Sequence, residues 1–331
     1  MPQTLRPATP DDIPQLVELL VLDAAARAAQ DDLLWRIADD ARAQVAEALG
    51  FALTSDAQPF RQIWQVAVDG GRIAGVVHSM LLPVPPIYAG AKGAPGLILP
   101  DCFAAPDAPE GTVTALVAAA EDALRDAGAR IILSSHVEGA DWLEAFRRRG
   151  HAPLTLYLSR SNVGDAGRPP GIRPATEADV PGIVRRSAEH RRVLFGIDPF
   201  WAAHPNADVR FAGWMKRSLT LRDRDMLVLG SPGNLGGYVI AQPAARLHFP
   251  PAHDISGTGV IDDFYHPDLA DPMALANGGT GATKLLRAAE AAFAGRGVGT
   301  AFVVCPAGWR SKIEVLEAAG YATAMVWSIK R

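Results

Sequence analysis

The opening segment of the sequence occurs a second time in the middle of the chain. Residues 5–20 are LRPATPDDIPQLVELL and residues 172–187 are IRPATEADVPGIVRRS, so both segments carry R-P-A-T-x-x-D followed by proline and a helix-like apolar pattern. A repeat at this distance in a chain of 331 residues constrains the fold strongly, because each copy is long enough to bury its own core. We therefore expect two domains of one kind, at 1–160 and 172–331, joined by a Gly- and Pro-rich linker at 161–171.

Each opening predicts a short strand, a helix cap and an amphipathic helix. Thr9 and Thr176 are each followed three residues later by an aspartate, a spacing typical of a capping box at a helix start. Pro14 and Pro181 fit the first turn, where the helix needs no N–H donor. The shared text is thus a strand-to-helix device, not a catalytic motif.

The similarity continues downstream in the same order. Each copy predicts a hairpin, a strand, a helix, a buried strand, a helix that ends at Gly150 or Gly320, and a last strand. The first three of these are expected at 65–78, 97–106 and 111–127 in one copy and at 226–240, 259–267 and 281–295 in the other. This order predicts an α+β fold in each half, with a mixed, mostly antiparallel sheet flanked by helices.

Composition excludes several classes of protein. A net charge of −4 and a pI near 6.1 argue against a nucleic-acid binder, and no apolar run is long enough to span a membrane. The first residues lack the features of a signal peptide, and Cys102 and Cys305 lie in apolar, strand-like text. We expect a cytoplasmic protein with two buried thiols. The eight histidines have no metal-ligand spacing, so no metal is expected.

The segment ANGGTGATKLL (276–286) lies between a predicted strand and a predicted helix, and suits a phosphate or pyrophosphate. A Walker loop is excluded because Thr283-Lys284-Leu285 lacks the required glycine before Lys and Ser or Thr after it. A dinucleotide-binding loop would need glycine at Lys284 and a parallel β-α-β context. A glycine-rich loop without a ligand is the remaining alternative.

The hairpin, the strand that reaches Pro267 and the Gly279-Thr280-Gly281 helix start together resemble the GNAT acyltransferase superfamily. The resemblance covers nearly the whole chain, twice, and implies two tandem GNAT-like domains. It also implies acetyl-CoA, or another acyl-CoA, as co-substrate, with the strand and the loop holding its pantetheine and pyrophosphate. The implied cofactor-binding residues are Phe264, Tyr265, Gly278, Gly279, Thr280, Gly281, Ala282, Thr283, Lys284 and Trp309. Trp309 stands where the family often has an asparagine; simple packing is its alternative role.

The N-terminal copy departs from the family at this loop. Counting back from the matched helices places Glu110-Gly111-Thr112 on Gly279-Thr280-Gly281. A carboxylate there would repel a pyrophosphate, and a threonine limits close backbone approach. We therefore expect the C-terminal half to be the active one.

Acyl transfer to an amine requires a base and a proton donor for the thiolate. The resemblance places the base on the strand before the loop, at Asp262 or Asp263, with His266 as a further candidate. As neighbours on one strand, the two aspartates should point to opposite faces. Asp101 matches Asp262 in the N-terminal copy. The family's usual tyrosine acid is replaced by Leu316, and in the first half by Phe146.

The acceptor is expected to be a small-molecule amine. After the basic helical face of Arg185, Arg186, Arg191 and Arg192, the segment 194–205 corresponds to the part that lines the acceptor pocket in the family. The candidate substrate-binding residues are Arg192, Phe200, Trp201 and Tyr238. The alternatives are a non-catalytic CoA-binding or sensing protein and other acyl-CoA chemistry, such as decarboxylation. We expect a monomer with an internal pseudo-dimer, or a homodimer.

Overall fold

The computed structural model describes residues 3–139, 141–164 and 167–331, so residues 165–166 of the expected linker lie outside it. The N-terminal half contains β1 (Thr4–Pro7), α1 (Ile13–Ala28), α2 (Ala41–Thr54), β2 (Gln62–Asp69), β3 (Arg72–Leu81), β4 (Gly96–Ile98), β5 (Phe103–Ala104), α3 (Thr112–Asp126), β6 (Ile132–Val137), α4 (Asp141–Arg148) and β7 (Ala152–Ser161). The C-terminal half contains β8 (Ile172–Pro174), α5 (Val180–Ile197), α6 (Ala207–Ser218), β9 (Asp225–Ser231), β10 (Asn234–Pro243), β11 (Thr258–Tyr265), α7 (Thr280–Gly295), β12 (Thr300–Pro306), α8 (Arg310–Ala318) and β13 (Ala322–Lys330). The expected α+β class and the repeated element order are confirmed. Helices α2 and α6 were not predicted.

The twin openings form the same structure in both halves. In the first, the Arg6 guanidinium donates two hydrogen bonds, of 2.6 and 2.8 Å, to the Asp12 carboxylate, which also accepts from the backbone and hydroxyl of Thr9. In the second, Arg173, Asp179 and Thr176 repeat the arrangement, with Arg–Asp distances of 2.7 and 2.6 Å. The residues that the two openings share thus tie the first strand of each half to its first helix, and each opening forms a capping box.

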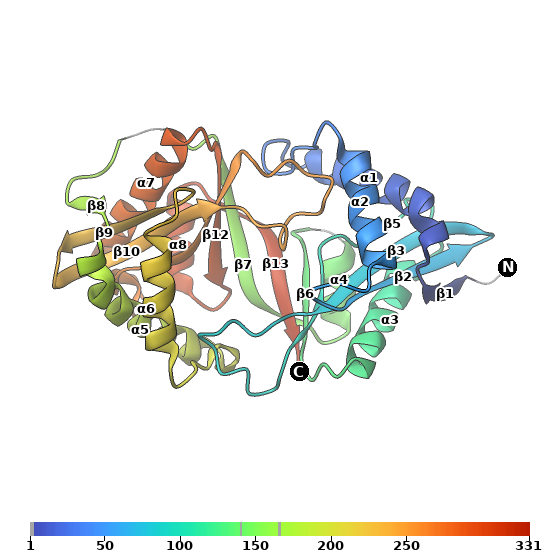
Figure 1. The fold of residues 1–331 in the computed structure, drawn as a ribbon, viewed down its shortest axis with the longest axis horizontal. Helices are drawn as coiled ribbons and strands as arrows, with labels where there is room; N and C mark the ends of the chain where they lie inside the picture. Colours follow the sequence, from blue (N-terminus) through green and yellow to red (C-terminus); the bar gives the residue numbers. More distant parts are fainter. Residues whose placement is uncertain (1–2, 140, 165–166) are drawn as a thin grey trace.

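The two halves share one sheet, and each sends its last strand into the other. The strand order is β1-β2-β3-β4-β6-β13-β7-β12-β11-β10-β9-β8, with β5 on β3. Strand β7 pairs with β12, whereas β13 pairs with β6, and β7 and β13 pair with each other at the centre (Figure 1). The described sheet therefore crosses the boundary between the repeats without a break.

A buried glutamate on α3 holds the strand that arrives from the C-terminal half. Glu121 is fully buried and accepts hydrogen bonds from Lys330 of β13 at 2.6 Å and from Arg149 at 2.9 Å. His151 Nε2 lies 3.0 Å from the same carboxylate, while Ser134 occupies its Nδ1. Several donors around one carboxylate offset the cost of its burial.

The C-terminal half has the matching contact. Glu290 of α7 is buried and binds Arg160 of β7, the strand that arrives from the N-terminal half, at 2.9 Å. The Tyr321 hydroxyl donates to Glu290 at 3.0 Å, in the place that His151 takes beside Glu121. Each exchanged strand is thus fastened by a basic side chain near its end.

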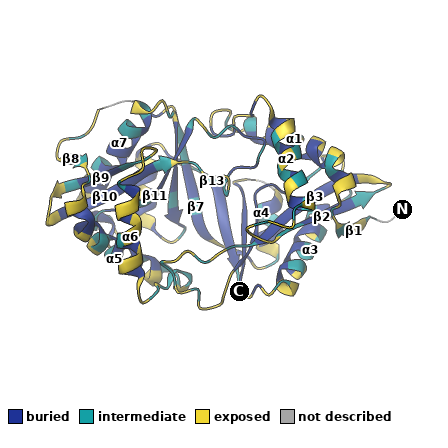
Figure 2. Cartoon of the chain, in the orientation of Figure 1, coloured by how far each residue is buried: buried dark blue, intermediate teal, exposed yellow. Residues whose placement is uncertain are grey.

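Helices cover both faces of the sheet, and a separate core lies where the halves meet. In the N-terminal half, α1 and α2 pack on the face of Trp64, Val66 and Val76, and α3 and α4 pack on the face of Ala67 and Val77. The central core takes side chains from both halves, including Trp35, Tyr157, Phe249, Phe302 and Trp327. Figure 2 shows the exchanged strands as the buried centre of the molecule, with exposed residues on the outer helices and loops.

Two loops also cross between the halves. The segment 82–95, between β3 and β4, reaches the α5–α6 connection, where Tyr88 forms a β-bridge with Ala203. The segment 244–257, between β10 and β11, reaches the α1–α2 connection in the same way, where His253 forms a bridge with Ile37. Each half therefore covers the corresponding region of the other.

Candidate active site

Strand β11 is irregular where the two candidate aspartates lie. Its pairing with β10 shifts by one residue between Val239 and Ala241, so Asp262 and Asp263 together lie opposite Ile240. Its parallel pairing with β12 ends at Ile261, although β11 continues to Tyr265. This is a β-bulge, a feature that re-aims side chains. The simple alternation expected for the two aspartates is therefore interrupted there.

Asp263 forms a buried polar cluster. It accepts a hydrogen bond of 2.5 Å from the hydroxyl of Tyr238, and His190 Nδ1 lies 3.4 Å from the same oxygen. Burial would raise the pKa of Asp263, but these partners and the nearby Lys312 outweigh it, so its pKa is lowered. Burial also lowers the pKa of His190, which leaves its imidazole neutral at neutral pH. Asp263 is thus an ionised carboxylate with one oxygen engaged by Tyr238 and His190.

Asp262 has the opposite character. Asp262 is exposed to solvent, but protein also lies close around its carboxylate. The resulting desolvation raises the pKa of Asp262 to about 6, and the charge of Asp263 contributes to the same shift. No hydrogen bond to another described residue engages its carboxylate. A carboxylate with a pKa near 6 suits a general base at neutral pH. Asp262 is the better placed of the two aspartates to meet a substrate.

The space beside β11 holds two large side chains from the start of α8. Trp309 is fully buried and donates its indole N–H to Leu269 O at 3.0 Å, so it packs within the protein. Lys312 is 1% exposed, and its ammonium lies over the rings of Phe264 and Trp309. The Lys312 ammonium donates a long hydrogen bond of 3.4 Å to Phe264 O. Burial lowers the pKa of Lys312.

The glycine-rich loop forms the N-terminus of α7, but its N–H groups have a partner within the chain. The buried Asp268 carboxylate accepts from Gly281 N at 2.8 Å and Ala282 N at 3.4 Å, and from the Asn277 side chain at 3.0 Å. Asn277, Gly278 and Gly279 all have left-handed backbone angles, which shape this turn. In this arrangement Asp268 occupies the place expected for a phosphate.

The other loop candidates lie around this turn. His266 Nδ1 accepts from Asp268 N at 3.1 Å, so His266 orients Asp268. Its ring lies so close to Gly281 that a Cβ there would be 2.2 Å away, which explains that glycine. Thr280 is exposed and bonds Asn277 O, while Thr283 and Lys284 are half-buried in the first turn. Gly278 to Lys284 thus form the turn before α7 and its first turn, and their role in binding the cofactor stays a prediction.

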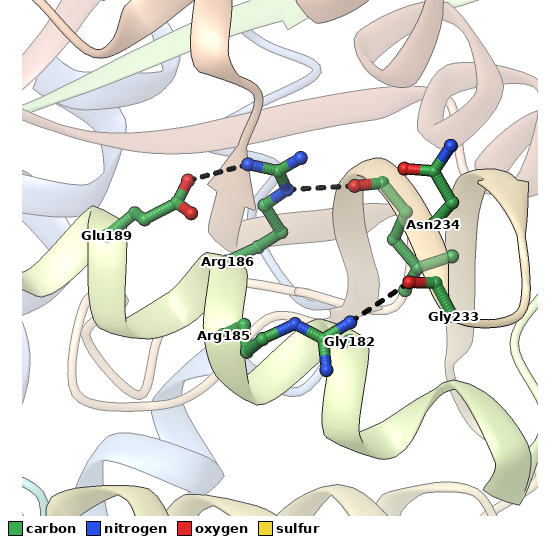
Figure 3. A pocket seen from close by; sticks show the side chains of 7 residues that line it. Gly182, Arg185, Arg186, Glu189, Gly233 and Asn234 are labelled. Carbon is green, nitrogen blue, oxygen red and sulfur yellow. Dashed lines mark hydrogen bonds and ion pairs between the residues drawn. The ribbon is translucent and has the colours of Figure 1, made fainter.

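The basic face of α5 is only partly free. Arg185 and Arg186 donate to the backbone oxygens of Gly233 and Leu235 and so hold the β9–β10 turn, around a small cavity of about 160 Å³ (Figure 3). Arg191 is buried and binds Ser187 and Asp208. These contacts stabilise the fold, and Arg192 alone of this set lines a larger opening.

That opening has a volume of about 490 Å³ and lies between α5 and the segment after β11. Arg192, Glu189, Tyr265 and Pro267 are among its lining residues. The other predicted acceptor residues are elsewhere: Phe200 and Trp201 pack edge to face at 4.8 Å near the junction of the halves. Tyr238 is fully buried. The structure therefore separates the predicted acceptor set into three places.

The N-terminal half differs at the matching positions. Asp101 is buried, and both of its oxygens lie 2.9 Å from His78 Nδ1, so it does not share the open setting of Asp262. Glu110 is exposed before α3, and the hydroxyl of Thr112, the first residue of that helix, bonds Pro109 O.

Sequence reasoning missed His190, Lys312 and Asp268. His190 lies in a run of charged residues, and Lys312 follows the Arg310-Ser311 start of a helix, so both resemble ordinary surface positions. Asp268 follows Pro267 at a strand end, where an aspartate is an ordinary turn residue. No motif marks these residues, because their contacts come from distant segments.

The fold is that of two GNAT domains in tandem. No protein-family model matches the sequence, and no curated protein matches it significantly. Among solved structures, the chain is similar to a GCN5-related N-acetyltransferase from Sphaerobacter thermophilus, with 18% identity, a TM-score of 0.56 and coverage of 99% of this chain and 95% of that one. It is also similar to a tandem GNAT protein from the clavulanic acid biosynthesis pathway, with 16% identity, a TM-score of 0.52 and coverage of 99% and 98%.

Among the residues that the structure describes, no helix combines the length and the apolar composition that a membrane span requires. Within the same part of the chain, no group of three or more His, Cys, Asp or Glu side chains is arranged to hold a metal ion.

Proposed function

We propose that the protein is an acyl-CoA-dependent N-acyltransferase that acts on a small-molecule amine, with its reacting groups in the C-terminal half. The observation that carries this proposal is the setting of Asp262. Its carboxylate is exposed to solvent, has a pKa of about 6, and lies on the β-bulge where β11 stops pairing with β12. The tandem GNAT fold supports it, and acetyl-CoA is the simplest donor.

In this proposal Asp262 takes the proton of the attacking amine. The amine nitrogen forms a bond to the thioester carbonyl carbon, the carbon–sulfur bond breaks, and the thiolate leaves. Asp263 keeps its charge through Tyr238 and His190, and so holds the bulge in place. Because Asp262 must be ionised, the rate should rise with pH up to about 6 and then level off.

Binding of acyl-CoA requires a change at the loop. Gly281 and Ala282 donate to Asp268, and a carboxylate there repels phosphate, so Asp268 must release these N–H groups first. After that release, the loop from Gly278 to Lys284 would offer the N–H groups of a helix start to the pyrophosphate.

The occupied loop also favours a second candidate, a non-catalytic protein that kept the fold. Asp268 in the phosphate position, together with Trp309 and Lys312 beside β11, is the specific observation behind it. Such a protein would bind CoA after the same release of Asp268, but it would transfer no acyl group.

One experiment separates the two. Calorimetry of the full chain with acetyl-CoA and CoA measures binding, and thiol release from acetyl-CoA across a panel of small amines measures turnover. The enzyme proposal expects both signals, with turnover lost in Asp262→Asn. Binding without turnover in any amine would favour the non-catalytic candidate, and absence of binding would overturn the enzyme proposal.

A further inference from the structure

Beyond Ile261, strand β11 has a neighbouring strand on one side only. On that side β10 continues beside it as far as Tyr265. On the other side its pairing with β12 ends at Ile261, although β12 itself runs on to Pro306. The Phe264 carbonyl instead accepts the hydrogen bond of 3.4 Å from the ammonium of Lys312. Lys312 thus takes over from β12 as a partner of β11, next to the two aspartates.

The start of α8 fixes the direction of the Lys312 side chain. Trp309 and Ser311 bind three backbone oxygens of the segment 269–272, at distances of 2.8 to 3.0 Å. The Lys312 ammonium lies 5.3 Å from the centre of the Phe264 ring and 5.2 Å from that of the Trp309 ring. The helix start is therefore fastened to the segment that follows β11, and the two rings enclose the ammonium between this segment and the strand.

The N-terminal half bridges the corresponding gap with a neutral group. After β4 has stopped pairing with β6, His136 Nε2 lies 3.4 Å from Cys102 O. Burial lowers the pKa of His136 to about 3, so its imidazole is uncharged at neutral pH. Trp142, which aligns with Lys312 when the two helices are matched at their last glycines, stacks on His136. A neutral side chain can thus bridge such a gap, whereas the C-terminal half uses a cation.

The burial of this cation indicates a role for its charge. Lys312 is 1% exposed, and no ion pair joins it to a carboxylate within the described part of the chain. An ammonium that is buried without such a pair is unfavourable. Phe264 directly follows Asp263, and successive residues of a strand are about 3.4 Å apart, so the ammonium lies against the same short piece of β11 as both aspartates. Burial acts to raise the pKa of Asp262 and of Asp263, and Lys312 opposes it at each.

The other titratable groups that interact with these three side chains come from five further parts of the fold. They are His190 of α5, Tyr238 of β10, Cys305 of β12, Tyr157 of β7 and Tyr88 of the loop 82–95. All five are uncharged at neutral pH, because burial lowers the pKa of His190 and raises the pKa of the other four. Arg191 interacts with several of them, but its guanidinium binds Ser187 and Asp208. Lys312 is therefore the cation that faces the two aspartates.

We propose that Lys312 is a positioning residue of the reaction site, which holds β11 where β12 leaves it and whose charge lets Asp262 and Asp263 serve different roles. This inference rests on the proposed function. With the cation in place, Asp263 stays charged and bound to Tyr238, and Asp262 is left to exchange a proton with the amine. Lys312 acts through the two aspartates and does not touch the substrate in this role.

The pH dependence of turnover tests the proposal in the full chain. Lys312→Met removes both the charge and the hydrogen bond, whereas Lys312→Gln removes the charge but keeps a donor for Phe264 O. Both variants should move the rising limb of the kcat profile above pH 6, by about one pH unit, because the Asp262 carboxylate loses a nearby opposite charge. Both should also stay folded, because neither variant buries a charge at this position.

Lys216→Met is the matched control, because it removes a lysine charge from the exposed side of α6 and should leave the profile unchanged. A wild-type profile in either Lys312 variant would overturn the proposal, since the charge would then have no effect on Asp262. Loss of the fold in both variants would also overturn it, because Lys312 would then serve stability alone.

A titration of the unloaded protein separates this proposal from the proposed function. Aspartate labelled with ¹³C at its carboxyl carbon allows Asp262 to be followed by NMR, with Asp262→Asn identifying its signal. The pKa of Asp262 should be about 6 in the wild type and higher in Lys312→Met, and equal values would overturn the role of Lys312. If the wild-type protein releases no thiol with any amine, the proposed function fails, and this titration still decides whether Lys312 controls the charge of Asp262.

Discussion

The two halves of this protein are built alike where they fold and differ where they could react. Both have the Arg–Asp–Thr cap, a buried glutamate that fastens the partner's strand, and a loop that crosses to the other half. At the strand irregularity, however, Asp101 is buried and bound to His78, whereas Asp262 is open to solvent. Both halves therefore have the same contacts in the scaffold, whereas the carboxylate is open to solvent at Asp262 and engaged at Asp101.

The largest loss of activity is expected when the open carboxylate of the C-terminal half is removed. Asp262→Asn removes the proposed base and should lower kcat by about 100-fold or more, as measured by thiol release. Asp101→Asn is the matched variant; it should leave kcat within a few-fold and lower the denaturation midpoint, because His78 loses a buried partner. Equal losses of activity in both variants would show that Asp101 also contributes to the reaction.

The exchanged strands offer the next test. Glu121→Gln leaves Lys330 and Arg149 without their buried carboxylate and should reduce the free energy of unfolding by roughly 3 kcal/mol. Glu290→Gln should cost less, because three described side chains bind its carboxylate and four bind that of Glu121. Urea unfolding at pH 7 measures both, with the surface variant Glu144→Gln as a control expected to be silent. A smaller cost at Glu121 than at Glu290 would contradict this ranking.

The occupied loop can be opened by Asp268→Ala. This change frees the N–H groups of Gly281 and Ala282 and removes a negative charge, so affinity for CoA should rise by about tenfold in calorimetry. Asp271→Ala alters an exposed carboxylate on the same segment and should leave affinity unchanged. Weaker binding in Asp268→Ala would mean that Asp268 organises the loop for CoA and does not block it.

The smallest effect, on the free energy of unfolding, is expected at the helix caps that the two halves share. Asp12→Asn and Asp179→Asn each weaken a cap and should reduce the free energy of unfolding by about 1 kcal/mol at pH 7. The hydrogen bond from Arg6 or Arg173 lowers the pKa of each carboxyl to about 2, although burial opposes it. Their contribution is therefore present above pH 4 and is lost as the pH falls toward 2. Unfolding curves at pH 7 and pH 3 measure this, and two very different costs would show that the caps are not equivalent.

Much of the fold followed from local pattern. The capping threonines, the hairpins and the glycines that end helices at Gly150 and Gly320 are signals carried by neighbouring residues, and the structure has each of them. Helices α2 and α6 were missed although their buried residues recur at helical spacing, as Ala41, Val45 and Leu49 do in α2 and Ala207, Phe211 and Met215 do in α6. The aspartates at 262 and 263 were found from the resemblance, but the sequence could not tell the occupied one from the open one.

The sequence by itself determined that one α+β unit occurs twice, because a repeat and its caps depend on residues within a few positions of each other. Only the tertiary structure decided that β7 and β13 change places, that Asp268 fills the loop at Gly281, and that Asp263 is bound by Tyr238. Each of these contacts joins segments that are distant in the chain or belong to different halves, so it depends on packing, burial and charge in three dimensions, which no local pattern records.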